Sequence, residues 1–128
     1  MSENLVVARR WVKLYNERGD VTEFLSLLDP EVELHTPGGP RLRGHDQARD
    51  WFEKEFENVR PRIVADRFVA EGDVVAGLGR TEVRWIESGE IAHESESAGV
   101  FWLRDGKIVR WQPFETHEAA LKAAGLAA

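Results

Sequence analysis

The sequence predicts an α+β domain in which three N-terminal helices pack on a strongly curved, mostly antiparallel sheet. Two observations carry this expectation: helical spacing of apolar residues dominates the chain up to Pro61, and long β-like segments joined by short turns follow it. Gly77, Gly79 and Gly99 interrupt those segments, as the bends of a curved sheet require. A curved sheet closed by helices leaves a cavity, so we expect a cone-shaped α+β barrel that encloses a pocket.

Three segments of the first half are predicted to be helical. Residues 3–18 place apolar side chains three and four positions apart, and Gly19 is a natural stop. Asp20 is a capping residue for a short second helix, which must end before Pro30. Helical spacing returns in residues 46–57, where the apolar positions are mainly aromatic.

The remaining elements are predicted to be strands and one final helix. Residues 31–36 alternate polar and apolar side chains and lead into the irregular loop 37–40. Thr116 can cap an alanine-rich helix that ends at Gly125. Between them we expect an antiparallel meander of four strands, at 62–70, 74–86, 91–104 and 107–115.

Composition limits the domain count, the partners and the location. The chain has 128 residues, enough for one core, so we expect a single domain over residues 1–128. Its net charge is -6 without a basic stripe, which argues against nucleic acid as a partner. The N-terminal segment is charged throughout and shows neither a leader nor a membrane-length span, so we expect a cytoplasmic protein without membrane contact.

Metal and cofactor motifs are missing from the sequence. It contains no cysteine, and its four histidines lack the spacing typical of a metal site. Gly77-Leu78-Gly79 is not followed by a third glycine and a helix, as a dinucleotide-binding motif would be. We therefore expect no metal and no cofactor.

Several short motifs along the chain together carry a family resemblance. They are Ala8-Arg9-Arg10-Trp11, Leu27-Leu28-Asp29-Pro30-Glu31-Val32, Thr36-Pro37-Gly38-Gly39 and Asp105-Gly106-Lys107-Ile108-Val109-Arg110-Trp111. With them the chain resembles the SnoaL-like branch of the nuclear-transport-factor-2-like superfamily, which includes polyketide cyclases, ketosteroid isomerases and limonene epoxide hydrolases. The resemblance implies the cone-shaped fold and a pocket for a small hydrophobic molecule. It leaves the reaction open, because this fold hosts catalysts, binders and interaction domains.

A polar pair on one predicted strand is the first candidate for chemistry. Arg80 and Glu82 are two residues apart and so share a face of the sheet. The pair resembles the Arg-x-Asp of limonene epoxide hydrolases, with glutamate in place of aspartate. With His35, a natural proton carrier at a strand end, they form the predicted catalytic set; a structural ion pair is the alternative for Arg80 and Glu82. The predicted substrate-binding residues are Trp11, Tyr15, Glu33, Trp51, Phe101, Trp111 and Glu115.

Other family positions depart from the known active sites. The second acid of the epoxide hydrolases falls on Pro113, and the catalytic aspartate of the ketosteroid isomerases falls on Thr36 or His35. The oxyanion-hole residues of those isomerases fall near Trp11 and Gly99. Neither reaction as such is therefore favoured.

Three functions stay open for the pocket. The first is acid–base chemistry of the cyclase, isomerase or hydrolase kind on a small hydrophobic molecule, and the second is ligand binding without catalysis. The third is a dimerising module whose pocket is filled by Trp11, Trp51 and Trp111.

An apolar surface is expected on the convex face of the sheet. Val83, Trp85, Val100 and Trp102 would form it if all four faced outward. An apolar patch of that size argues for a partner, and we expect a two-fold homodimer through this face. The alternative is that the C-terminal helix covers it.

Overall fold

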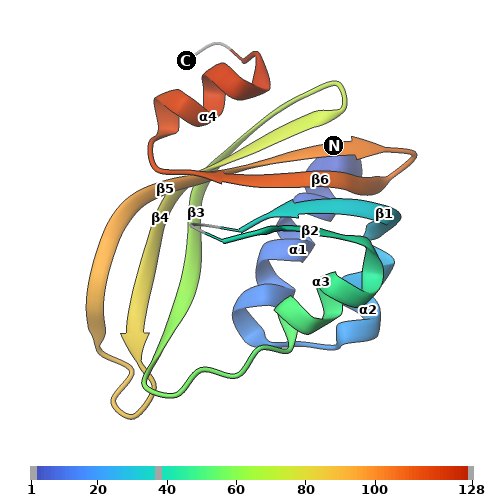
Figure 1. The fold of residues 1–128 in the computed structure, drawn as a ribbon. Coiled ribbons are helices and arrows are strands. Elements are labelled where there is room, and N and C mark those ends of the chain that lie inside the picture. Colours follow the sequence, from blue (N-terminus) through green and yellow to red (C-terminus); the bar gives the residue numbers. More distant parts are fainter. Residues whose placement is uncertain (1–2, 37–38, 127–128) are drawn as a thin grey trace.

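The computed structural model describes residues 3–36 and 39–126. It is an α+β fold with four helices and a six-stranded sheet that is not closed (Figure 1). Of the irregular loop predicted at 37–40, Pro37 and Gly38 lie outside the described residues. In chain order the elements are α1 (Glu3–Glu17), α2 (Val21–Ser26), β1 (Leu28–His35), β2 (Arg41–Arg43), α3 (Gly44–Phe52), β3 (Val59–Glu71), β4 (Val74–Trp85), β5 (Ile91–Arg104), β6 (Lys107–Phe114) and α4 (His117–Ala124).

The sheet has the strand order β2-β1-β6-β5-β4-β3. The predicted meander is β3 to β6, whose neighbours pair antiparallel, whereas β1 lies parallel to β6. That parallel pairing reaches Leu28, opposite Ile108, so β1 begins earlier than its alternating pattern indicates. The three residues of β2 were not predicted as a strand, because two arginines around one leucine give too short a pattern.

Two helix ends differ from the sequence prediction. Helix α3 ends at Phe52 rather than at residue 57, and the guanidinium of Arg18 donates hydrogen bonds to the carbonyls of Phe52 and Lys54 just at that end. At the end of α1 the left-handed residue is Arg18, with φ 52°, and not Gly19. The amide of Gly19 then bonds back to the carbonyl of Leu14 at 3.0 Å and closes the helix.

The strands β3 and β4 approach each other very closely at Gly79. A side-chain Cβ at this position would lie 1.8 Å from the carbonyl oxygen of Val64, so only glycine fits. The register of β3 shifts by one residue between Ala65 and Arg67 at the same level. A bulge of this kind bends and twists a strand. The two long strands therefore curl around α1 to α3 (Figure 1).

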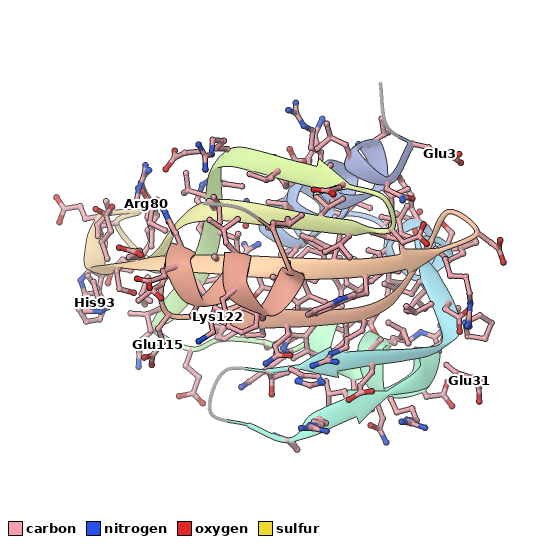
Figure 2. All side chains as sticks on the ribbon, turned by 90° about the horizontal axis from the view of Figure 1, so that it is seen from above. Glu3, Glu31, Arg80, His93, Glu115 and Lys122 are labelled. Atoms are coloured by element: carbon pink, nitrogen blue, oxygen red, sulfur yellow. The ribbon has the colours of Figure 1, made fainter. Side chains whose placement is uncertain are left out.

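The curved sheet has a different apolar cluster on each face. The larger one lies on the concave side, under α1 to α3, and is centred on Trp11, which is fully buried. The smaller one lies on the convex side, where α4 packs on β4, β5 and β6 (Figure 2). Its buried members are Ala76, Leu78, Ala98, Val100, Ala120 and Leu121.

The expected apolar patch on the convex face is not a single surface. Val100 and Trp102 belong to the cluster under α4, so the helix covers that part of the face. Val83 and Trp85 share the opposite face with Thr81, because β4 pairs with β3 without a register shift from Gly79 to Trp85. The prediction of one patch from these four residues is wrong, and the homodimer stays a prediction.

No helix in the described part of the chain is long and apolar enough to cross a membrane.

Gly79→Ala tests whether the close approach of β3 and β4 maintains the curvature. We expect the free energy of unfolding to fall by about 3 kcal/mol, because the methyl group collides with backbone that cannot move aside. Gly77→Ala is the matched control: its Cβ would meet the edge of the Phe68 ring at 3.1 Å, and a side chain can yield. Urea unfolding measures both. Equal losses of unfolding free energy in the two variants would contradict a special role for the close approach at Gly79.

Candidate ligand-binding cavity

A cavity of about 640 Å³ lies between α1, α3 and the concave face of the sheet. Its size is within the usual range for small-molecule sites. The five aromatic residues predicted to bind substrate all line it: Trp11, Tyr15, Trp51, Phe101 and Trp111.

The aromatic side chains form one continuous wall of the cavity. Trp51 lies 5.0 Å from Tyr15 and 6.0 Å from Trp11 between ring centroids, both nearly parallel. Trp111 packs against Trp11 at 4.8 Å, and Phe101 meets Trp11 edge-on at 5.3 Å. Because the rings stack on one another, they leave the 640 Å³ open, which argues against a pocket filled by tryptophan.

Three glycines lie on the sheet side of the cavity. Gly77, Gly79 and Gly99 all line it. At Gly99 a Cβ would lie 2.8 Å from Nε1 of Trp111, so this glycine makes room for the indole beside β5. The glycines that bend the sheet therefore also provide the space inside it.

Besides Tyr15 and Thr36, polar residues line the cavity on the sheet and on α3. On the sheet, the hydroxyls of Thr81 and Ser97 are hydrogen-bonded to each other at 2.7 Å. On α3 and just beyond it, Gln47, Asp50 and Lys54 contribute one amide, one carboxylate and one ammonium group. Sequence reasoning missed all five, although the alternation of β4 from Gly79 to Thr81 carried a signal for Thr81.

Tyr15 is the phenol of the aromatic wall. Burial raises the pKa of its hydroxyl above the ordinary value, while the positive charges of Arg18 and Arg60 act in the opposite direction. The group is therefore a hydrogen-bond donor at neutral pH.

Arg80 and Glu82 lie on the other side of the sheet from the cavity. They alternate with Gly79 and Thr81, which line it, and they share their face with Leu78 of the cluster under α4. Figure 2 shows Arg80 beside the N-terminal end of α4, where His117 bonds to the carbonyl of Gly79 at 2.8 Å. The expected Arg80–Glu82 wall of the cavity is wrong, because a spacing of two fixes a shared face but not which face it is.

Glu82 is the centre of an ion-pair network on that outer face. Its side chain is 6% exposed and accepts from Arg84 at 2.9 Å and from Arg80 at 3.4 Å. The hydrogen bond from Arg84 lowers the pKa of the Glu82 carboxyl, and burial opposes this. Arg80 also reaches Asp66 at 3.2 Å and Glu94 at 3.4 Å. Glu82 thus stays ionised and fully paired.

The other predicted polar residues also lie outside the cavity lining. His35 and Glu33 pair with each other at 2.7 Å between Nε2 and Oε1, and Glu33 faces Arg41 and Arg43 of β2 at 3.7 and 3.8 Å. Glu115 is exposed after the end of β6. The expectation that these three residues contribute to the cavity is wrong, because they occupy the outer face or the strand end.

No group of three or more metal-ligating side chains occurs among residues 3–36 and 39–126.

Solved structures share this fold over nearly the whole chain. An NTF2-like protein of unknown function from Burkholderia pseudomallei has a TM-score of 0.71 at 20% identity, covering 97% of this chain and 98% of its own. An LEH-like epoxide hydrolase from M. tuberculosis has a TM-score of 0.72 at 17% identity, and the match covers 95% of this chain and 89% of its own. TerC, co-crystallised with polyporic acid, has a TM-score of 0.71 at 22% identity, and the match covers 96% of this chain and 98% of its own. At these identities the likeness shows the fold alone.

Sequence comparison identifies the family. A search of curated protein sequences gives no match. The SnoaL-like domain, in contrast, matches residues 8–111, which include most of α1, the aromatic wall and most of the sheet. The chain belongs to the SnoaL-like domain family.

Proposed function

We propose that the chain binds a small, mostly apolar molecule in the 640 Å³ cavity. The observation that carries the proposal is the continuous aromatic wall opposite a single hydroxyl pair, Thr81 and Ser97. Such a surface suits a flat ligand that stacks on the rings and makes one or two hydrogen bonds. TerC, a protein of the same fold, was co-crystallised with polyporic acid, which supports a ligand of that kind.

Two substitutions at Ser97 test the cavity with 1-N-phenylnaphthylamine, a neutral probe that fluoresces in apolar surroundings. Ser97→Phe fills the space beside Thr81, and we expect it to weaken probe binding by about tenfold or more. Ser97→Ala removes the hydroxyl but keeps the space, so its affinity should stay within about twofold of the wild type. Equal fluorescence from all three proteins would contradict binding in the cavity.

Acid–base catalysis on the bound molecule is the second candidate function, and Asp50 favours it. It is the one carboxylate among the described residues that line the cavity, and Tyr15 supplies a protonated hydroxyl on another wall. A carboxylate base and a hydroxyl donor are the groups that proton abstraction next to a carbonyl needs. Binding without catalysis is the alternative.

Asp50→Asn separates catalysis from binding. Exchange of the acidic protons of 2-tetralone in D₂O, followed by NMR, should be faster with the wild-type chain than in buffer. The variant should lose about tenfold or more of that acceleration, because a general base typically contributes more than this. Asp46→Asn, a fully exposed carboxylate on the same helix, is the control. No acceleration by the wild type would favour the non-catalytic alternative.

Glu82→Gln tests whether the outer-face network is structural or catalytic. We expect the free energy of unfolding to fall by about 2 kcal/mol at pH 7, because two guanidinium groups lose a buried partner. Since folding lowers the pKa of Glu82, its contribution is complete above the unfolded value near 4.5 and is lost as the pH falls through the folded one. The difference from wild type should therefore shrink below about pH 4.5 in urea unfolding.

Glu94→Gln is the control for that experiment, because its carboxylate also pairs with Arg80 but is 45% exposed. This substitution should change the free energy of unfolding little at any pH. A Glu82 variant that keeps full stability but loses turnover of a cavity substrate would instead favour the catalytic role predicted for Glu82, Arg80 and His35.

A further inference from the structure

A second hollow, of about 750 Å³, lies on the far side of the segment that joins α3 to β3. Lys54, Phe56 and Pro61 line both this groove and the aromatic cavity, so the segment separates the two. In Figure 1 the segment runs along the lower edge of the molecule, towards the β4–β5 hairpin. We call this hollow the basic groove. Its charged lining residues are Arg18, Lys54, Arg60, Arg62, Arg84, Glu53 and Glu55.

The charge of the groove is opposite to that of the whole chain. Five cationic side chains line it against two carboxylates, whereas the chain carries a net charge of -6. The ion pairs among the described residues include Arg84 but none of Arg18, Arg60 and Arg62. With Arg84 neutralised by Glu82, four cationic side chains still face two carboxylates, so a local surplus of positive charge remains in the groove.

Two of these arginines are held in place by backbone carbonyls. Arg18 donates to the carbonyls of Phe52 and Lys54, and Arg60 donates to the carbonyl of Asn16 at 2.5 Å. Carbonyl groups orient a guanidinium but do not neutralise it. Burial lowers the pKa of Arg18, and the nearby charge of Arg60 lowers it further. Two oriented like charges side by side are an arrangement that an anion would stabilise.

Apolar side chains complete the groove. Trp85 and Ile86, at the end of β4, line it and are 48% and 49% exposed, although they are large hydrophobic residues. Phe56 lies under the guanidinium of Arg18, with its ring centroid 5.2 Å from Cζ. The groove therefore offers an apolar surface next to the guanidinium groups of Arg18, Arg60 and Arg62, which form none of the ion pairs found among the described residues.

We propose that the basic groove binds a small amphipathic carboxylate, whose acid group lies between Arg18, Arg60 and Arg62 and whose apolar part lies on Trp85 and Ile86. Arginine side chains bind carboxylates well because the planar guanidinium group can donate hydrogen bonds to both carboxylate oxygens. The exposed tryptophan supplies the apolar contact that a simple inorganic anion does not need. This site is separate from the aromatic cavity and does not depend on the function proposed for it.

Isothermal titration calorimetry with decanoate tests the groove, with 1-decanol as the neutral probe of equal chain length. The wild type should bind decanoate, and the affinity should fall as salt rises. Arg60→Gln and Arg62→Gln should each lower the affinity for decanoate by about fivefold to tenfold, as the loss of one charge-assisted contact implies. Arg67→Gln, an exposed arginine on β3 that lines neither hollow, should have no effect.

The exposed position of Arg62 and one variant of the aromatic cavity keep the result unambiguous. Arg60 holds a backbone carbonyl, so its variant can lose stability, but Arg62 is exposed and its variant should fold like the wild type. Ser97→Phe, which fills the aromatic cavity, should leave decanoate binding unchanged. The proposal is overturned if decanol binds as tightly as decanoate, if Arg62→Gln behaves like Arg67→Gln, or if Ser97→Phe abolishes binding.

Discussion

The close contact of β3 and β4 at Gly79 is the constraint on which the rest of the structure depends. The backbones approach so closely there that the position has no room for a Cβ, and the extra residue in β3 lies beside it. Bending at this point turns a flat meander into a surface that can surround α1 and α3. The helices bury Trp11 completely on the concave side, and the cavity is the space that they do not fill. Curvature, core and cavity thus have one origin.

The two faces of β4 carry side chains of opposite chemistry. Alternate residues of a strand point to opposite sides, so Gly79 and Thr81 face the cavity while Arg80 and Glu82 face α4 and solvent. The concave side of β4 can face a ligand because its residues there, Gly77, Gly79 and Thr81, are small and carry no charge. The outer face carries the ion pairs, which need solvent at the exposed edges of Arg80 and Arg84 to offset the cost of burying Glu82.

Short motifs predicted the family by resemblance. Periodicity and turn residues, which are local signals, predicted the helices and strands other than β2, and the five aromatic residues expected in the pocket line the cavity. The sequence also predicted that Arg80 and Glu82 would lie together, which is correct, but not on which face. That choice is made by packing: the apolar neighbours Ala76 and Leu78 share their side with the ion pair and lie under α4. The basic groove was beyond sequence reasoning, because it assembles arginines from three segments that are distant in the chain.

The cavity is lined by two kinds of residue, those that also form the core and those that do not. This difference explains why family motifs identify the fold but not the reaction. Trp11, Trp51 and Trp111 belong both to the ligand surface and to the core, so replacing any of them costs stability as well as binding. Gln47 and Asp50, in contrast, are exposed on α3 and support no core contact. Such residues can change at little cost to folding. The chemistry of a fold like this one is therefore carried by the residues that its motifs constrain least.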